Sequence, residues 1–599
     1  MKRKQDLRPW RKRVNRMVYH KLVKINDQWV QEAFDRQVMD NESRYFGGVV
    51  DPATGIPWPS HTNSLMIMGL WAAAIINPDS AYYHDNVLLK RLNKLTRFML
   101  KFQHDDGTIS PGWTNYHSPP DTAFNVVGLS QIYKLLTLSD WQPAVSVAAD
   151  VHLFLGRTIP ALLTGGIHTP NHRWVICSAL GSLYDIFGIE ALKERASEWL
   201  SEGLDITPDG EWTERSNGIY NAVSDINLYY AARYLERPEL LESVRANLRM
   251  MMYLVHPDGE IVTDYSGRQD FGQKFTLADY YSIYQLMAVH DRDPLFAAMA
   301  SLAGEAITHP GALPNNAMLN LLLHPALREN SVQPAELPTE YRKIINGDFN
   351  RSLYLSKMEQ AGHNGKISHS SFHPEFGAPV ARHRIGKTSA TVMTEATSFF
   401  ALRHGHARLL GIQVGSNFEP GTIKFKELQE RSGAYLLKAQ EKKGYYGPVP
   451  QAELPETASE SLSPWYLLPH HTRSMTHEQT HETFVEAAET KEGWTLRVRS
   501  DKPADVLTQV VFLFGAEGTL HTDGCEPVGE DTIMWRNGSV RYENKGDWIE
   551  IEGAASEHSS TAIRNMVYPR GCQMLLVNLI TPINHTFNIR VSPNAASNG

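Results

Sequence analysis

The sequence has few cysteines and no excess of basic residues, and both shortages limit what the chain can do. Its 599 residues include three cysteines, Cys177, Cys525 and Cys572, which are too few and too scattered for a disulfide framework or a thiolate metal site. The formal net charge is -8 at pH 7, whereas nucleic-acid-binding proteins usually carry a basic patch or stripe. We therefore expect a protein of a reducing compartment that does not bind nucleic acid.

Targeting and membrane segments are also missing from the sequence. The basic start, MKRKQDLRPWRKRVNRMVYHKLVKI, is followed by neither an apolar segment nor a small-residue cleavage site, so it does not match a secretory signal. No run of about 18 apolar residues could span a bilayer. Apolar residues recur within the basic start and favour a helix that packs on its own protein over a membrane-surface helix: Trp10, Val14, Met17, Val18 and Leu22. We expect a cytoplasmic protein with no membrane partner.

The first half of the chain has the pattern of a helical array. Single hydrophobic cores stop growing at roughly 250–300 residues, so a chain of this length should hold more than one domain. Between about residues 63 and 306, segment after segment carries apolar residues at three- and four-residue intervals, which is typical of amphipathic helices.

Three turns in this half share a motif: HDDGTI at 104–109, TPDGEW at 207–212 and HPDGEI at 256–261. Their spacing indicates a repeat of about fifty residues, and LTGGIHT stands where a further copy is due near 157–166. Such a period accommodates two helices and two connections. An open solenoid would fit this repeat. Turns that recur at one end of helical hairpins also suit a closed α/α toroid with a central funnel.

The second half of the chain has a different residue pattern. After about residue 310, short segments rich in Val, Ile, Thr and aromatic residues alternate with turn residues, which predicts an antiparallel β-sandwich. RSLYLSKM at 351–358 and TSATVMTEA at 388–396 are two of them. We therefore predict a multidomain α+β chain: an α/α toroid catalytic domain with an N-terminal helical extension at 1–306, a linker at 307–349 and the β-sandwich at 350–599.

Two phrases in the helical half combine chemically active residues. TPNHRW at 169–174 puts Asn171 and His172 directly after a proline at the start of a predicted helix, where free backbone N–H groups favour an anion. PDGEWTERSNGIY at 208–220 puts Tyr220 in the first turn of another helix. Alone, His172 would more often be a surface histidine and Tyr220 a core tyrosine. Together they can bind a carboxylate and remove a proton beside it.

The tyrosine needs a neighbouring cation for this chemistry. Tyrosine has an unperturbed pKa of about 10, and a cation close to the ring favours the phenolate. Arg215 or a protonated His172 could provide that cation. An amide, an imidazolium and a guanidinium would then neutralise the carboxylate while the phenolate abstracts the proton.

A helical toroid followed by a β-sandwich, with Asn-His in one loop and Tyr about fifty residues later, resembles the heparinase II/III-like polysaccharide lyases, including their alginate-lyase branches. The resemblance implies that Asn171 and His172 neutralise a uronate carboxylate and that Tyr220 acts as acid, base or both. It also implies a further catalytic histidine from the β domain. Several compete for this role, and we rank His383 first because Arg382 and Arg384 flank it; the others are His373, His404 and His406.

Further residues are candidates for substrate contacts. Aromatic residues at predicted connections would stack on sugar rings, and polar residues near the two phrases would bind hydroxyl or carboxylate groups. The complete set is Arg215, Glu214, Asn217, Trp174, Arg268, Tyr116, Trp212, His373 and His404, with Trp113 as an additional aromatic.

A metal pattern lies in the second half. HEQTH at 477–481 matches the zinc-protease motif, which requires a helix, but its Thr-rich flanks and the hairpin pattern after it indicate a strand or loop. A structural divalent metal could instead be held by the neighbouring histidines, His470, His471, His477 and His481. The expected chemistry requires no cofactor.

Other functions remain open at this point. Paired carboxylates serve glycoside hydrolysis, and the acids available in the helical half are Asp121, Asp209, Glu211, Glu214 and Asp225. Asp209 could equally be a turn residue, and Asp121 could cap the helix that begins near Thr122. A third alternative is a non-catalytic glycan-binding protein.

The favoured prediction is a lyase that cleaves an acidic oligosaccharide or polysaccharide by β-elimination and leaves an unsaturated uronate. The sequence leaves the glycan, its linkage, internal or terminal attack and the oligomeric state open.

Overall fold

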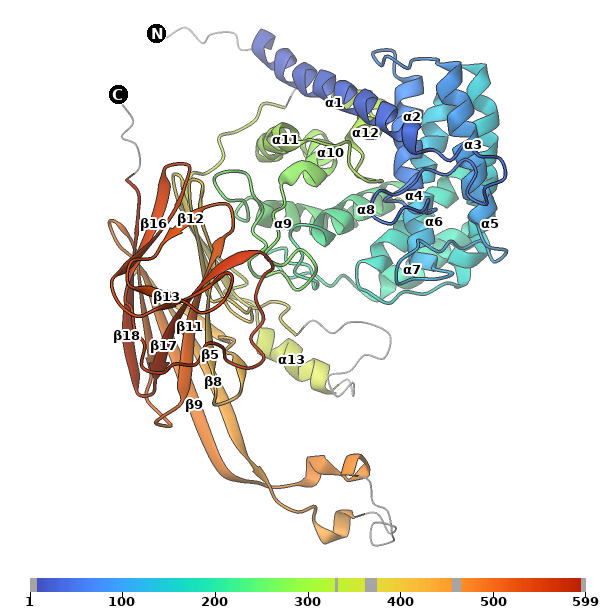
Figure 1. Cartoon of the computed structure of the whole chain (residues 1–599). Helices are drawn as coiled ribbons and strands as arrows, with labels where there is room; N and C mark the ends of the chain where they lie inside the picture. The colour runs from blue at the N-terminus through green and yellow to red at the C-terminus, as the bar shows by residue number, and fades with distance from the viewer. Residues whose placement is uncertain (1–7, 329–331, 361–373, 455–464, 594–599) are drawn as a thin grey trace. The chain divides into compact units, whose positions relative to one another are not determined.

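The computed structural model describes residues 8–328, 332–360, 374–454 and 465–593, with the side chains of 8–17 and 359–360 excepted. The chain divides into two compact units. Unit 1 contains Met1–Pro338 and Asp348–Gly377, and unit 2 contains Thr339–Gly347 and Ala378–Gly599. Helices dominate the first unit and strands the second (Figure 1).

Unit 1 is an α/α toroid. Its helices, in chain order, are α1 (Arg8–Arg36), α2 (Ser64–Ile76), α3 (Asn86–Phe102), α4 (Pro119–Leu138), α5 (Val145–Thr164), α6 (His172–Phe187), α7 (Glu190–Ser201), α8 (Tyr220–Tyr234), α9 (Leu241–Met251), α10 (Tyr281–Asp291), α11 (Pro294–Ala306), α12 (Ala317–Leu323) and α13 (Arg351–Gln360). Helices α2, α4, α6, α8 and α10 contact one another in series, and each packs against the helix that follows it.

Burial separates the inner helices of the toroid from the outer ones. In inner helix α6 every residue from Trp174 to Leu183 is buried, whereas outer helix α3 buries one stripe that includes Leu88, Leu92 and Leu95. A helix that is apolar all round needs partners on every side, and an amphipathic helix needs them on one. The inner helices therefore form the core, and the outer helices shield it from water.

The N-terminal helix α1 packs on this core, as its apolar residues predict. Leu22 and Val30 are buried, the Tyr19 hydroxyl donates to Asn77 Oδ1 at 2.8 Å, and Asn26 Nδ2 donates to the Leu70 carbonyl at 3.1 Å. Among the described residues, one helical stretch, Gln142–Thr164, is long and apolar enough to cross a membrane; 44% of its apolar window is buried inside the fold.

The three predicted turns have the same backbone structure, which confirms the repeat. In each turn the glycine N–H donates to the carbonyl three residues earlier, and the glycine has a positive φ of 83°, 103° or 87° at Gly107, Gly210 and Gly259. A side chain is excluded at Gly107, because a Cβ there would lie 2.0 Å from the Arg157 carbonyl oxygen. Each turn precedes an inner helix, namely α4, α8 or α10.

Unit 2 is a β-sandwich in which most strand pairs are antiparallel and one pair of the first sheet is parallel. One sheet has the strand order β1-β2-β3-β4-β5-β11-β17-β14-β13, with β6 paired to β5, and the other has the order β12-β15-β16-β18-β10-β9-β8-β7. The strands of the first sheet are β1 (Glu340–Ile345), β2 (Val380–Ile385), β3 (Thr388–Met393), β4 (Phe400–His404), β5 (Ala407–Ser416), β6 (Gly421–Thr422), β11 (Leu507–Gly515), β13 (Cys525–Pro527), β14 (Thr532–Trp535) and β17 (Cys572–Ile580). Those of the second are β7 (Glu427–Arg431), β8 (Ala434–Tyr446), β9 (Met475–Glu489), β10 (Gly493–Ser500), β12 (Thr519–His521), β15 (Ser539–Asn544), β16 (Asp547–Glu552) and β18 (Ile583–Val591).

Alternating side chains build the core of the sandwich. Along β10, Trp494, Leu496 and Val498 are buried, whereas Arg497 and Arg499, at the alternate positions, are exposed, as expected for a strand with one face on the core. The far ends of β8 and β9 pair only with each other and extend as a two-stranded ribbon (Figure 1, orange). The strand pattern of the second half is thereby confirmed.

The domain limits and one element differ from the sequence prediction. The range 307–349, expected as a linker, contains helix α12 and strand β1, and β1 pairs with β2 in the sandwich. Segment 351–358, expected as a strand, is part of helix α13 and belongs to unit 1. It contains no Val, Ile or Thr, so nothing in it opposes a helix.

Candidate active site

Asn171 and His172 lie at the start of α6, directly after Pro170. The Asn171 backbone N–H donates to Glu214 Oε2 at 3.2 Å, and its Nδ2 donates to the same oxygen at 2.7 Å. Glu214 comes from the connection before α8, so one carboxylate ties together the two sequence phrases that carry the predicted site. The structure thus brings Asn171, His172 and Glu214 into one place.

Arg268 joins this group from the loop before α10. Its Nη1 forms an ion pair with Glu214 Oε1, and its guanidinium carbon lies 4.3 Å from the centre of the Tyr220 ring. Tyr220 is the first residue of α8. Positive charge therefore lies directly over the ring of the expected acid–base residue, and it comes from Arg268 instead of Arg215.

The turn that presents Tyr220 is held by a buried carboxylate. Asp270 Oδ2 accepts the Gly218 N–H at 2.9 Å, and its Oδ1 accepts the Ser216 hydroxyl at 2.9 Å. Ser216 Oγ in turn accepts the Tyr220 backbone N–H at 3.2 Å. These bonds fix the loop before α8 and so fix the direction in which the Tyr220 side chain points.

Burial changes the charge expected at His172. Desolvation, together with the nearby His168 and Arg268, lowers the pKa of His172 to about 3, because burial and neighbouring positive charge both disfavour the charged form. His172 is therefore neutral at pH 7 in the free protein, whereas the sequence analysis expected a cation. Burial also raises the pKa of Glu214, although Arg268 and Asn171 oppose that rise.

His61 is a member of the group that the sequence analysis missed. Its ring stacks on Phe124 with the ring centres 4.3 Å apart, and Phe124 also meets His172 edge-on at 6.5 Å. Desolvation lowers the pKa of His61 to about 4 in spite of the nearby Asp121, which opposes that change. A signal was present, because Pro59 and His61 precede α2 much as Pro170 and His172 start α6.

Three polar atoms in this group are buried without a hydrogen-bond partner among the described residues: Asn171 Oδ1, His172 Nδ1 and His61 Nδ1. Leaving such an atom unpaired costs roughly 1–3 kcal/mol, so native proteins rarely keep several of them together. The arrangement is typical of a site whose polar groups pair with a ligand.

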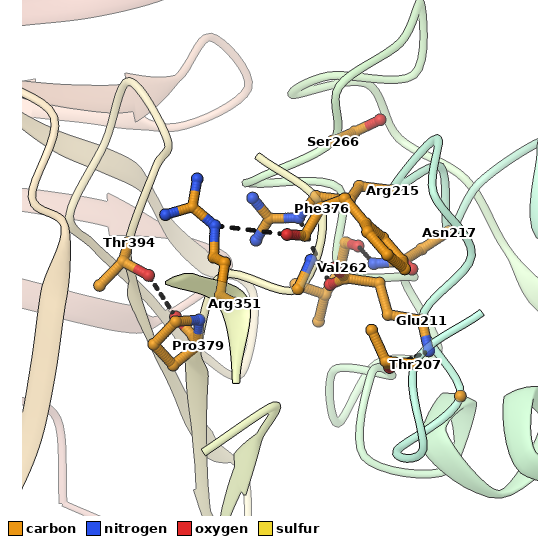
Figure 2. A network of polar contacts seen from close by, with 12 residues as sticks. Thr207, Glu211, Arg215, Asn217, Val262, Ser266, Arg351, Phe376, Pro379 and Thr394 are labelled. Carbon is orange, nitrogen blue, oxygen red and sulfur yellow. Dashed lines mark hydrogen bonds and ion pairs between the residues drawn. The ribbon is translucent and has the colours of Figure 1, made fainter. Parts of the chain in front are cut away.

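Four predicted contact residues are not available to a substrate, because the structure buries them. Trp174 is 1% exposed and packs against Trp212, whose indole N–H donates to Asp225 at 3.1 Å. Asn217 donates to the Val262 carbonyl at 2.9 Å. Arg215 is 1% exposed and forms an ion pair with Glu211 at 3.3 Å (Figure 2), and its guanidinium lies over the Tyr265 ring. All four support the loops of the site instead of lining it.

The predicted aromatic residues of the loop before α4 are accessible. Tyr116 is 75% exposed and Trp113 is 41% exposed. The Trp113 ring meets His61 edge-on with ring centres 6.4 Å apart. This loop therefore carries free aromatic surface beside the polar group.

The competing histidines of the sandwich have partners inside unit 2. His383 is 4% exposed, lies 3.2 Å from Glu489 and meets Trp494 edge-on between the two sheets. His404 bonds Thr388 and Ser592 through its two ring nitrogens. His406 pairs with Asp547 at 3.0 Å, and His373 lies outside the described residues. The contacts of His404 are those of a core histidine, whereas both ring nitrogens of His383 lack a hydrogen-bond partner among the described residues.

The predicted metal patterns are not assembled. HEQTH lies on strand β9, so its histidines lack the helical spacing of a zinc protease, as its flanks indicated. His481 bonds Glu441 and Ser500, and His470 bonds the Trp465 carbonyl. Within the described residues, no three His, Cys, Asp or Glu side chains form a group that could hold a metal ion.

Most of the carboxylates proposed for a hydrolase are buried or hydrogen-bonded to other parts of unit 1. Asp225 is fully buried, and burial raises its pKa far above the usual range. Glu211 is also buried and accepts the Gly377 N–H at 2.9 Å. Asp121 accepts the hydroxyl of Ser118, the residue that caps α4. The cap is therefore Ser118, and Asp121 stays a member of the site region through His61.

Comparison with known proteins identifies the fold. A scan against protein-family models and a search of curated proteins gave no match. Among solved structures, the chain is similar to a Paenibacillus xanthan lyase, with a TM-score of 0.51 and 10% identity over 97% of this chain and 57% of that chain. It is also similar to heparinase III, with a TM-score of 0.50 and 11% identity over 92% of this chain and 81% of that chain. These similarities confirm the predicted fold class, a helical toroid followed by an antiparallel β-sandwich.

Proposed function

We propose that the chain is a polysaccharide lyase that cleaves a uronate-containing glycan by β-elimination. The observation that carries this proposal is the group in which Glu214 joins Asn171 to Arg268 while Arg268 covers Tyr220. An amide, a guanidinium and a phenol are the groups needed to bind a carboxylate and move the proton next to it. Both solved structures named above are lyases, which supports the same reaction class.

Binding of the uronate carboxylate would use Asn171 and Arg268. Both already donate to a carboxylate, Glu214, and a substrate carboxylate would share these donors. Two carboxylates close together cannot both stay ionised easily, and burial already favours the protonated form of Glu214. Uptake of a proton by Glu214 would therefore accompany substrate binding and remove the repulsion.

Proton transfer would use Tyr220 with His172 beside it. The C5–H bond of the uronate breaks, the C4–O bond breaks, a C4–C5 double bond forms and the departing oxygen receives a proton. Arg268 over the Tyr220 ring would stabilise negative charge on the tyrosine while it takes the C5 proton. A neutral His172 with a free Nδ1 can accept a hydrogen bond or a proton, which a cationic imidazolium cannot do. As proposed, the reaction uses side chains alone and requires no cofactor.

Incubation with uronate-containing oligosaccharides tests the proposal. Elimination creates a conjugated double bond that absorbs ultraviolet light, and the product masses together equal that of the substrate. A hydrolase would add one water to the products without new absorbance, and a binding protein would change neither quantity. Hydrolysis in place of elimination would refute the proposed function.

A further inference from the structure

The residue that follows His172 has no role in the reaction described above, although its side chain is largely buried. Arg173 is the second residue of α6, and its side chain is 12% exposed. Its Nη2 lies 2.8 Å from Asp205 Oδ1 in an ion pair, and its Nη1 donates to the Gly203 carbonyl at 3.3 Å. Both partners belong to the connection that runs from α7 to α8 and carries Glu214.

An aromatic ring fixes the guanidinium of Arg173 from a third direction. The central carbon of the guanidinium lies 4.5 Å from the centre of the Trp174 ring, and Trp174 packs against Trp212 of the same connection. A planar fork that uses two nitrogens and lies on a ring is restricted to one geometry, whereas a lysine ammonium is a point charge on a flexible stem. Arg173 therefore holds the connection at a defined place relative to α6.

The contacts of this pair continue to the carboxylate of the proposed site. The Asp205 carbonyl accepts the Thr213 N–H at 3.0 Å, and Thr213 directly precedes Glu214. Glu214 Oε2 accepts both the backbone N–H and the side-chain amide of Asn171, which lies two residues before Arg173. These contacts form a closed ring that leaves the first turn of α6, passes through the connection and returns to the start of α6.

We propose that Arg173 and Asp205 are positioning residues that hold Glu214, and through it Asn171, in place for binding of the uronate carboxylate. Glu214 lies in a connection with little regular secondary structure, so its position depends on long-range contacts of this kind. A displacement of about 1 Å in a binding group can lower a rate by about 10²-fold. This inference rests on the proposed function, because it concerns the binding of a uronate.

Replacement of Asp205 tests the pair through KM. The substrate is the uronate tetrasaccharide that the wild type eliminates fastest. Asp205→Ala should raise KM by about tenfold, the order of one lost hydrogen bond, and change kcat by less than about threefold. KM responds because the carboxylate-binding groups loosen, while Asp270 separately holds the loop before Tyr220. Asp205→Asn keeps an oxygen where Arg173 makes its contact and should stay near the wild-type KM.

Asp291→Ala is the matched control. Asp291 forms an ion pair with Arg245 at 2.7 Å, and these side chains are 17% and 21% exposed, against 21% and 12% for Asp205 and Arg173. The control pair lies at the end of α10, whereas the loop that carries Arg268 precedes that helix. Asp291→Ala should lower the melting temperature by a similar amount and leave KM unchanged. An equal rise of KM in both variants would overturn the positioning role.

A second variant covers the case in which Asp205→Ala does not fold. Arg173→Lys keeps the positive charge but cannot form the same fork with Asp205 and the Gly203 carbonyl. It should raise KM in the same way. A wild-type KM in folded Arg173→Lys would contradict the inference.

Hydrogen exchange tests the positions without any substrate. In Asp205→Ala, peptides that cover 169–175 and 205–214 should exchange faster, because they contain the donors of the ring, and in Asp291→Ala they should exchange as in the wild type. If the wild type eliminates no uronate substrate but these peptides lose protection in Asp205→Ala alone, the lyase proposal fails while the hold of the pair on Glu214 stands. Unchanged exchange, or an unchanged KM in folded and active Asp205→Ala, would overturn the inference and leave the lyase proposal intact.

Discussion

Two histidines of the sandwich and two of the toroid differ in their hydrogen bonding. In the sandwich, His404 and His481 are buried, and each bonds two side-chain oxygens through its two ring nitrogens. In the toroid, His61 and His172 also lose water, yet each leaves Nδ1 unpaired among the described residues. Desolvation lowers the pKa of His404 to about 4 and that of His172 to about 3, so a lowered pKa does not separate the two kinds. Unpaired Nδ1 atoms separate these two pairs of histidines, but they are not confined to the toroid, because both ring nitrogens of the buried His383 in the sandwich also lack a hydrogen-bond partner among the described residues.

Removal of the Tyr220 hydroxyl should have the largest effect and should be confined to function. General acid–base groups contribute typically about 10²–10⁴-fold, so Tyr220→Phe should lower kcat by that order while the ring keeps its place under Arg268. Rates of elimination and a melting curve measure the two effects. Tyr229→Phe on the same helix is the control and should retain activity. Near-normal turnover by Tyr220→Phe would contradict its assigned role.

Substitution of either partner in the Arg268–Glu214 ion pair should have the next largest effect. Loss of one partner from a mostly buried ion pair costs about 3–5 kcal/mol, because the other charge is left behind. Glu214→Gln and Arg268→Gln should each lower stability in denaturant titrations. The double variant should recover part of that loss, and it should stay inactive because the cation over Tyr220 is gone. Additive losses in the double variant would show that the pair is not coupled.

A direct comparison of the two histidine types follows from the contrast between the units. His404→Ala removes two hydrogen-bonded contacts from the sandwich and should lower the free energy of unfolding by about 1–3 kcal/mol, with elimination unchanged. His172→Ala should do the reverse and lower turnover much more than stability. Thermal melts and kcat for both variants check this. Equal destabilisation by both substitutions would remove the distinction drawn here.

The pH dependence of stability should show a smaller effect. The folded pKa of His172, about 3, lies below the unfolded value of about 6.5, so the unfolded chain takes up a proton first. The stability that neutral His172 contributes is complete above about pH 6.5 and is lost as the pH falls towards 3. His172→Gln should therefore show a smaller drop in melting temperature between pH 7 and pH 4 than the wild type. A steeper drop in His172→Gln than in the wild type would mean that His172 is charged in the folded protein.

Local patterns were sufficient for much of this fold and for part of the site. Apolar periodicity predicted the toroid helices, repeated Asp-Gly turns predicted their connections, and a proline before His172 located one helix start. Arg268 could not be assigned its role in this way, because its loop has no periodicity and is folded by long-range bonds such as Gly267 N–H to the Arg215 carbonyl.

The burial of Trp174 and Trp212 could not be predicted from the sequence either. Helical spacing shows which residues share a face, but it does not show whether that face meets solvent or another helix. Trp174 lies in the first turn of the inner helix α6, in which every residue from Trp174 to Leu183 is buried, so the indole that was expected to stack on a sugar is part of the core.

The connection between β1 and β2 has a consequence for biosynthesis. Its residues 348–377 belong to unit 1 although both strands belong to unit 2, and within unit 1 Glu211 accepts the Gly377 N–H while Arg351 donates to the Phe376 carbonyl (Figure 2). A ribosome that has released only the first 338 residues has not yet supplied the Gly377 N–H that Glu211 accepts. Unit 1 is therefore complete only after Gly377 has left the ribosome, by which time β1 has left it as well.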